Sequence, residues 1–315
     1  MTGKTREFPP SCPNEKPEHS PLTYNRYLKV SDLKKLQVCL SDPPHHDEPL
    51  FIVIHQTYEL WFKLIIHELD EAVRLMKEDK VRRSTFYLRR VGAIMKLLVQ
   101  QIHILETMTP RDFLGFRENL TPASGFQSSQ FRELEFIGGL KSSASLEHFK
   151  EDTEAFIALE ARFNAPSLGE LFYDLLARRG FSMPVAVDAS DEEAHRVKEE
   201  RIQQLIKIYE DEDTYGDLLD LAEALLDFDE QIFLWRFNHV TVVERIIGFK
   251  RGTGGSEGVS YLRSTLDKRC FPELWQLRTY FRLPGSSEPA TASSYGGAET
   301  APAATGEQGC PFGHS

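Results

Sequence analysis

The chain has 315 residues, of which 41% are hydrophobic and 27% are charged, proportions that are ordinary for a globular protein. Its 48 acidic side chains outnumber its 37 basic ones and give a net charge of -11, which repels phosphate backbones and argues against a nucleic-acid partner. No apolar run approaches the roughly 20 residues that span a bilayer, and the N-terminus lacks the apolar stretch of a secretory signal. We therefore expect a cytoplasmic protein that binds no membrane.

Composition divides the chain into three parts. Residues 1–21 are rich in Pro, Glu and Lys, and residues 284–315 are small, polar and low in complexity. Neither tail can bury enough apolar area to offset the entropy lost on ordering, so we predict that both are disordered. Residues 22–283 are expected to form one all-helical domain.

Helical periodicity dominates the first half of this domain. Residues 50–80 carry apolar side chains at spacings of three and four, the pattern of a long amphipathic helix, and residues 84–108 predict a second one. Residues 109–130 contain two prolines, two glycines and several serines. This composition predicts an irregular loop.

The second half continues the helical pattern. Residues 191–213 predict a heavily charged helix in a small hairpin arm, and residues 218–248 predict a third long helix. A glycine-rich stretch follows at 252–258. No segment shows convincing period-two alternation, so the fold class is all-α. A multi-helical array with long loops fits these lengths better than a short-looped four-helix bundle.

The four cysteines are widely spaced and form no CxxC pair. Closely spaced pairs are typical of zinc sites held by thiolates. Their absence from the sequence argues against such a site and favours reduced thiols in a cytosolic protein. The cysteines are Cys12, Cys39, Cys270 and Cys310.

His239 interrupts the apolar stripe of the third long helix. The stripe runs through Phe228, Ile232 and Trp235 and resumes at Val242, so the imidazole faces the core. Burial favours the neutral imidazole, which is the form that binds a metal. A core histidine that hydrogen-bonds a backbone carbonyl explains the same spacing and is the commoner case. The position alone leaves both interpretations open.

His55 raises the same question on the helix predicted for residues 50–80. It follows Phe51 by one turn and lies beside Tyr58 and Phe62 on the helical wheel. A neutral imidazole on an apolar wall can make one directed hydrogen bond to a ligand. For this residue alone, a structural role is the default interpretation.

A di-iron centre, which helical proteins often hold, does not fit this sequence. Such a centre needs ExxH pairs on two helices, and the only ExxH here runs from Glu192 to His195 in the charged arm. His55 and His67 lie twelve residues apart, about a third of a turn out of phase, so they do not converge.

Two loops have the composition expected for recognition of charged groups. Arg117 follows Phe113 and Phe116 in the sequence and precedes a Pro-Ala-Ser-Gly run. An arginine among aromatic side chains can bind a carboxylate bidentately. A surface ion pair is the alternative. The glycine-rich stretch around Thr253 has no preceding strand and no Lys-Ser/Thr pair, so it is not a P-loop. It suits either closure over a small polar ligand or a flexible linker.

Three long blocks together resemble the tryptophan 2,3-dioxygenase family. They are LFIVIHQTYELWFKLIIHELD at 50–70, LLVQQIHILETMTPRDFLGFRENLTPASGFQSSQFRELE at 97–135 and FLWRFNHVTVVERIIGFKRGTGGSEGVSYLRST at 233–265. The resemblance runs from Tyr24 to Phe281, essentially the whole predicted domain. Blocks of this length are far more specific than a short motif.

The resemblance implies a b-type haem whose iron is ligated by His239. It implies that His55 lies on the distal side of the haem and hydrogen-bonds the indole N–H, while Phe51 packs against the indole ring. Arg117 is expected to pair with the substrate carboxylate, and Thr253 to help hold the ammonium–carboxylate end. Further pocket residues implied by the resemblance are Phe113, Ser124 and Gly125.

The resemblance also implies a homotetramer. The segment YNRYLKV is similar to the family segment that crosses to a neighbouring subunit. Tyr24, Tyr27 and Leu28 would then complete the neighbour's pocket.

The implied reaction inserts both atoms of O2 across the indole C2–C3 bond of L-tryptophan and gives N-formylkynurenine, the first step of tryptophan catabolism by the kynurenine route. His55 is interpreted as an orienting partner, because the indole N–H is too weak an acid for neutral imidazole to deprotonate. The nearest alternative is a relative of the same fold that hydroxylates indoles or tyrosine derivatives with peroxide. A haem sensor and a helical scaffold without cofactor are alternatives from other classes.

Overall fold

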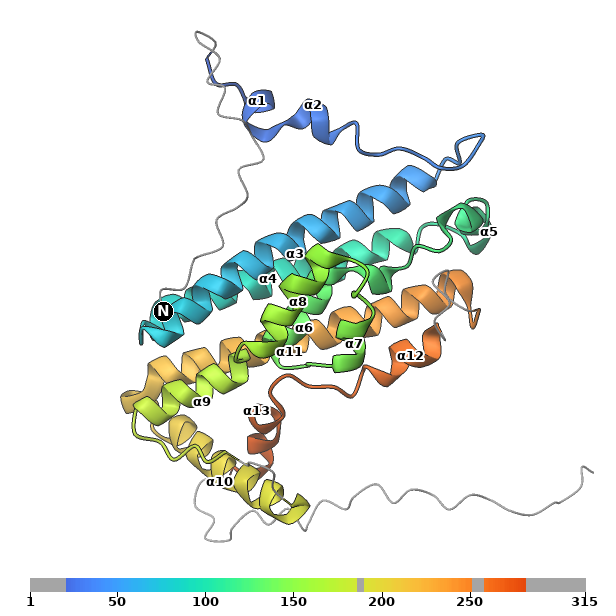
Figure 1. The fold of residues 1–315 in the computed structure, drawn as a ribbon. Coiled ribbons are helices and arrows are strands. Elements are labelled where there is room, and N and C mark those ends of the chain that lie inside the picture. The colour runs from blue at the N-terminus through green and yellow to red at the C-terminus, as the bar shows by residue number, and fades with distance from the viewer. Residues whose placement is uncertain (1–20, 186–189, 251–257, 282–315) are drawn as a thin grey trace, which may run out of the picture.

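The computed structural model describes residues 21–185, 190–250 and 258–281, drawn in colour in Figure 1. Within these ranges the regular secondary structure is entirely helical, which confirms the predicted all-α class. The predicted disorder of the two tails falls almost wholly outside the described residues, and the domain limits at 22 and 283 stay a prediction. No helix in the described ranges is long and apolar enough to cross a membrane.

Three long helices form the body of the molecule: α3 (Glu48–Lys77), α4 (Val81–Leu105) and α11 (Glu212–Ile247). They correspond to the three predicted long helices, although α11 begins six residues earlier than 218. A short turn reverses the chain between α3 and α4, and α4 packs against both α3 and α11. In Figure 1, α3 begins at the end of the body where α4 and α11 finish.

The sequence explains where α3 begins and what it buries. Pro49 stands in its first turn, where a missing backbone N–H costs nothing, and Arg74 and Lys77 in its last turn complement the helix dipole. Ile65 and Leu69, from the predicted apolar stripe, are fully buried against the neighbouring helices. Burial of this stripe stabilises the helix far more than local propensity does.

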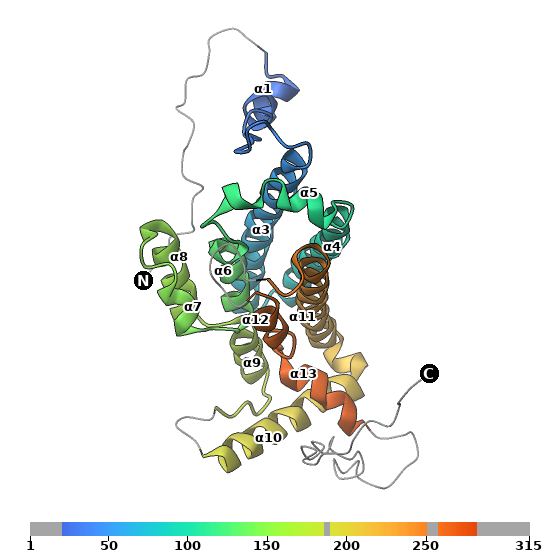
Figure 2. The ribbon, with the colours of Figure 1, turned by 90° about the vertical axis from the view of Figure 1, so that its right-hand side faces the viewer.

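Smaller helices cover two sides of this body, as the turned view in Figure 2 shows. In the first group, α6 (Ser129–Gly138) and α9 (Leu168–Arg178) pack against α3, and α8 (Thr153–Asn164) packs on α6. The predicted charged helix is α10 (Asp191–Glu210), which packs against α11 and α13 (Pro272–Gln276). The remaining short helices are α1 (Tyr24–Leu28), α2 (Val30–Leu33), α5 (Pro110–Leu114), α7 (Ser143–Glu147), α12 (Val259–Ser264), η1 (Arg117–Leu120), η2 (Gly125–Gln127) and η3 (Leu277–Tyr280).

Residues 21–40, which we call the N-terminal arm, stand apart from the body. Figure 1 shows α1 and α2 beside the body rather than within it, joined to α3 by an extended segment. Neither short helix buries a residue, and Tyr24 and Tyr27 are 74% and 71% exposed. The arm therefore presents apolar side chains that its own chain does not cover.

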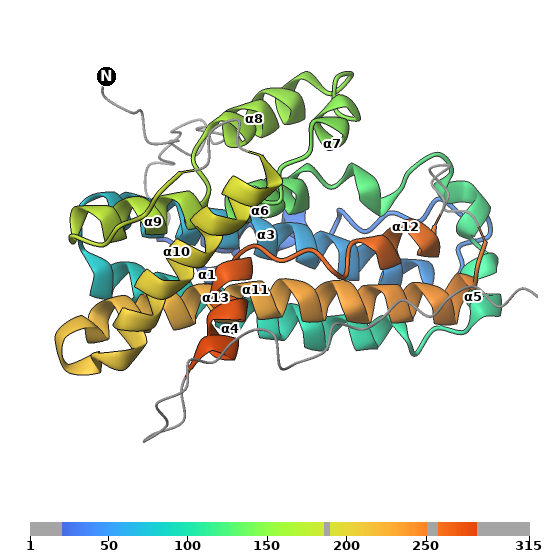
Figure 3. The ribbon, with the colours of Figure 1, turned by 90° about the horizontal axis from the view of Figure 1, so that it is seen from below.

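The C-terminal segment is held against α11 by one buried carboxylate, in the region where Figure 3 shows α13 lying across α11. Asp229 is 1% exposed and accepts hydrogen bonds from the backbone N–H groups of Cys270 and Phe271 at 2.9 and 3.0 Å. The indole N–H of Trp275 donates a third, at 2.9 Å. Because charged hydrogen bonds are the strong ones, this cluster fixes the segment that leads to α13.

Candidate functional site

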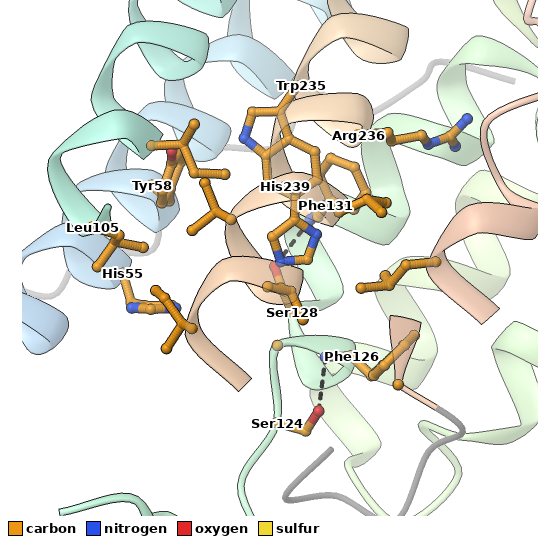
Figure 4. A pocket seen from close by; sticks show the side chains of 18 of the residues that line it. His55, Tyr58, Leu105, Ser124, Phe126, Ser128, Phe131, Trp235, Arg236 and His239 are labelled. Atoms are coloured by element: carbon orange, nitrogen blue, oxygen red, sulfur yellow. Dashed lines mark hydrogen bonds between the residues drawn. The ribbon is translucent and has the colours of Figure 1, made fainter. Parts of the chain in front are cut away.

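A pocket of about 280 Å³ lies at the end of the body where α3 begins and α4 and α11 finish (Figure 4). This volume is close to the range of small-molecule sites, and such sites are lined mainly by apolar side chains with a few polar groups. The walls here follow that pattern. The apolar wall residues are Phe51, Tyr58, Phe62, Ile102, Leu105, Met108, Phe113, Phe126, Phe131, Trp235, Val240, Val242, Val243, Ile246, Ile247, Tyr261 and Leu262.

His239 points into this pocket from α11. Its ring stacks on Trp235 with the centroids 5.0 Å apart and an angle of 19° between the planes. Burial lowers the pKa of His239 to about 4, with a smaller contribution from the charge on His55, so the imidazole is neutral at pH 7. No residue in the described ranges hydrogen-bonds to the ring. The backbone-carbonyl bond of a satisfied core histidine is thus not seen in the described ranges, and the ring nitrogens are open to the pocket.

His55 has a defined hydrogen-bonding role on the other side of the pocket. Its Nδ1 lies 2.7 Å from the carbonyl oxygen of Phe51, which can only accept, so Nδ1 carries the proton. His55 is exposed where it lines the pocket, and desolvation by the surrounding protein lowers its pKa, so the neutral ring presents Nε2 as an acceptor. The imidazole also packs on the Phe51 ring, with centroids 4.1 Å apart. A ligand N–H is the complementary group.

The predicted irregular loop at 109–130 contains three short helical turns rather than none. Thr109 caps α5 and Ser124 caps η2, each by a reciprocal pair of side-chain and backbone hydrogen bonds. These caps shape the loop at the pocket. Arg117, Ser124 and Gly125 all line it.

Aromatic packing surrounds the part of the loop that carries Arg117. The rings of Phe113 and Phe116 lie 5.6 and 5.7 Å from that of Phe51, and 5.4 Å from each other. Arg117 follows Phe116 directly and begins η1. Arg117 lines the same pocket as Phe51 and Phe113, and a guanidinium in such a largely apolar pocket is suited to a carboxylate ligand.

The structure brings most of the predicted site residues into one pocket but not all of them. The three arm residues Tyr24, Tyr27 and Leu28 do not line the pocket of their own chain. Thr253 lies outside the described residues. The predicted residues that do line the pocket are Phe51, His55, Phe113, Arg117, Ser124, Gly125 and His239.

Sequence reasoning missed a buried ionic cluster on the pocket wall. Arg236 of α11 is 4% exposed and pairs with Glu135 of α6, which also pairs with Arg132. The Nε of Arg132 is buried, and no residue in the described ranges accepts a hydrogen bond from it. Charged residues on helices usually face solvent, so only the approach of Glu135 on α6 to Arg236 on α11 in the folded chain could reveal this cluster.

The residues that line the pocket fit a haem. The walls are apolar, a neutral imidazole projects between them, and Arg132 offers a buried N–H to an anionic group such as a propionate. In the described ranges, no three His, Cys, Asp or Glu side chains converge as a metal-ion site. Fold and pocket together define an all-α protein with a largely apolar pocket into which one neutral histidine projects.

The sequence comparisons define the family. The chain belongs to the tryptophan 2,3-dioxygenase family, whose model matches residues 11–165 and 189–281. It is 42% identical to the tryptophan 2,3-dioxygenase of Myxococcus xanthus over 263 residues, 83% of this chain and 90% of that protein. The enzymes of the same name from Bacillus cereus and Exiguobacterium sibiricum are 43% and 44% identical, each match covering 82% of this chain and 92% of the relative. The resemblance inferred from the three sequence blocks is therefore confirmed.

Proposed function

We propose that this chain is a haem-dependent dioxygenase that inserts O2 across the indole C2–C3 bond of L-tryptophan and forms N-formylkynurenine. Membership of the family supports the reaction. The observation that carries the proposal for this chain is the meeting of neutral His239, neutral His55 and Arg117 in one apolar pocket. These groups meet the separate needs of a cofactor, an indole and an amino-acid carboxylate.

His239 is the proposed ligand of the haem iron. Its neutral ring has its nitrogens available, and the Trp235 ring stacked on it restricts its rotation. Arg132, which lines the pocket and whose buried Nε has no acceptor in the described ranges, would donate to a propionate. When bound, ferrous haem supplies the activation of O2 that no amino-acid side chain provides.

The protein's proposed part is to bind and orient tryptophan. Arg117 pairs with the carboxylate, Phe51 and Phe113 flank the indole, and Nε2 of His55 accepts the indole N–H. Thr253, which lies outside the described residues, would contribute at the ammonium–carboxylate end. Desolvating the carboxylate without a bidentate cation would cost several kcal/mol, so the same arrangement disfavours indoles that lack the amino-acid end.

His55 is proposed to orient the substrate rather than to remove its proton. The lowered pKa makes its imidazole a weaker base than free histidine, and the indole N–H is a very weak acid. His55→Ala and the substrate N1-methyltryptophan test this assignment. Turnover that is reduced but measurable in both cases supports orientation, and complete loss in both would instead support an obligate base.

The N-terminal arm is proposed to complete the pocket of a neighbouring subunit in a homotetramer. Tyr24, Tyr27 and Leu28 are exposed in the single chain, and apolar side chains of this size normally become covered. Light scattering of the full chain and of Tyr24→Ala/Tyr27→Ala measures the assembly and the arm's part in it. A cytoplasmic location stays a prediction of the sequence.

One experiment tests the function directly. The haem-loaded protein is reduced, mixed with L-tryptophan, and followed by its absorption spectrum and by O2 consumption. We expect a Soret band that shifts on addition of tryptophan, and O2 uptake that matches formation of N-formylkynurenine without added peroxide. A requirement for peroxide would favour the hydroxylating relative. Stable O2 binding without turnover would favour a sensor, and absence of a Soret band a scaffold.

A further inference from the structure

The residue run Gly115-Phe116-Arg117 touches a part of the chain that the proposed mechanism does not use. A Cβ on Gly115 would lie 2.7 Å from Cδ2 and 2.8 Å from Nε2 of His45. Real side chains essentially never approach this closely, so the imidazole edge occupies the space that any other residue at position 115 would need. His45 also packs on Phe116, with ring centroids 5.4 Å apart.

His45 cannot move aside freely, because its own turn is fixed. Its Nδ1 accepts from the backbone N–H of Asp47 at 3.2 Å, and its backbone N–H donates to the hydroxyl of Ser41 at 2.7 Å. Ser41 is in turn bound through both its hydroxyl and its N–H to the buried carboxylate of Glu48, which also accepts from Leu40 at 2.6 Å. The turn at 41–48 is therefore anchored to the first residue of α3.

The contacts of His45 lead directly to the proposed substrate site. Phe116, against which His45 packs, is 1% exposed. It is the single residue between Gly115 and Arg117. Phe116 also packs against Phe51 and Phe113, which line the pocket. Gly115 is exposed and His45 half-buried, but Phe116 between Gly115 and Arg117 is buried against His45, Phe51 and Phe113. A displacement of the backbone at Gly115 is therefore expected to shift Phe116 and the start of η1.

We propose that His45 is a positioning residue for Arg117: its ring fills the space beside Gly115, sets the place of η1, and so sets the preference for ligands that carry a carboxylate. This inference rests on the proposed role of Arg117 in binding the substrate carboxylate. It assigns no chemical step to His45. Gly115, which has no side chain, and the His45 ring, which fills the space beside it, form one complementary pair.

Gly115→Ala tests the pair with two ligands that differ by the carboxylate. The haem-loaded protein is titrated with L-tryptophan and with tryptamine, and binding is followed at the Soret band. We expect Gly115→Ala to weaken L-tryptophan about tenfold, because small misplacements of a binding group cost this much or more, and tryptamine less than twofold. In steady-state assays the loss should fall on KM for L-tryptophan, with kcat close to wild type.

His45→Ala/Gly115→Ala provides the rescue. Removing the ring makes room for the new methyl group, so most of the tenfold loss in L-tryptophan affinity should be recovered. His45→Ala alone should weaken binding of L-tryptophan about threefold, since it leaves a gap beside Phe116.

Gly92→Ala is the matched control, because a Cβ there meets nothing within 4 Å. Gly92 also lies ten positions along α4 from Ile102, the nearest α4 residue that lines the pocket. It should bind both ligands like wild type.

Three results would overturn the inference: no loss in Gly115→Ala, an equal loss for both ligands, or a double variant as weak as Gly115→Ala. An equal loss would mean that the contact serves folding in general. Binding and oxidation of L-tryptophan by the wild-type protein test the proposed function separately. If wild type binds L-tryptophan without oxidising it, the proposed function fails while the titrations still decide the inference. If wild type does not bind L-tryptophan, both fail.

Discussion

Asp229 and His239 lie on the same helix, ten residues or about 15 Å apart, and differ in how their polar atoms are satisfied. Asp229 is enclosed and accepts three N–H donors from its own chain. His239 has no hydrogen-bond partner in the described ranges and faces a pocket. The half-buried imidazole therefore keeps its ring nitrogens open to the pocket, whereas the oxygens of Asp229 are already used by the chain itself. We call these two regions of α11 the anchor, around Asp229, and the pocket, around His239.

Changes at the pocket should alter binding and turnover with little effect on stability, and changes at the anchor should do the reverse.

The largest effect is expected for His239→Ala. Loss of the proposed iron ligand should abolish the normal Soret band and lower tryptophan turnover by about a thousandfold or more. Added imidazole should restore part of the spectrum, and the circular dichroism should stay helical. The control is the exposed His195→Ala on α10. Retention of the wild-type Soret band in His239→Ala would remove this residue from the cofactor site.

Arg117→Ala is expected to give the next largest effect. Loss of a charged bidentate partner is worth about 2–3 kcal/mol, so KM for L-tryptophan should rise roughly 30- to 160-fold while tryptamine binding changes little. Arg89→Ala is the matched control, since Arg89 makes an exposed ion pair with Asp220 that contributes little. Unchanged steady-state kinetics would show that Arg117 does not contact the substrate.

Asp229→Asn tests the anchor. The amide cannot accept all three N–H donors, so we expect a loss of about 3 kcal/mol in the free energy of unfolding and a Tm lower by roughly 6–12 °C. KM for L-tryptophan, measured well below the transition, should stay at the wild-type value. Asp220→Asn, at an exposed carboxylate, should leave Tm unchanged within about 1 °C. A raised KM with an unchanged Tm would show that the two regions are not separate.

The smallest effect concerns Glu48, which is buried and satisfied like Asp229 but lies at the pocket end of α3. Burial raises its pKa, but hydrogen bonds from the backbone N–H of Leu40 and from the hydroxyl and N–H of Ser41 outweigh burial and bring the pKa below its usual 4.5. A lowered pKa contributes stability that is complete above about pH 4.5 and is lost as the pH falls through the folded-state value.

Glu48→Gln should therefore destabilise the protein by about 1–2 kcal/mol at pH 7, and the difference from wild type should shrink below pH 4.5. Urea unfolding at several pH values between 7 and 3.5 measures this difference. A gap that stays constant over the whole range would mean that the charge on Glu48 is not what stabilises the turn.

The long helices could be predicted from the sequence because their apolar stripes are continuous. For α3 and α4 the predicted and observed limits differ by only a few residues. The first residues of α11 were not predicted because 212–217 contain only one large apolar residue, Tyr215, and therefore carry little periodic signal. Tyr215 also has non-helical backbone angles, so a kink separates these residues from the long helix. The turns within 109–130 were missed for another reason. Their caps pair residues only two or three positions apart, within a segment where proline and glycine dominate the signal.

The site was predictable only in part. Periodicity placed His239 on a buried face, but resemblance to a family was needed to favour a ligand over a core residue. The cluster of Arg132, Glu135 and Arg236, and the contact of His45 with Gly115, join segments that are far apart in the chain. No local pattern encodes such meetings, because each depends on how the helices pack.

The turn at 41–48 joins two parts of the molecule that would serve different active sites. It leads from the N-terminal arm into α3, and through His45 it also supports the loop that carries Arg117. In the proposed tetramer, the arm binds to a neighbouring subunit, while the loop that carries Arg117 binds the chain's own substrate. Binding of the arm to a neighbour and binding of substrate by the loop would then both depend on the turn at 41–48. Any coupling free energy between these two binding events acts equally in both directions. Assembly would tighten substrate binding by the same factor by which substrate tightens assembly.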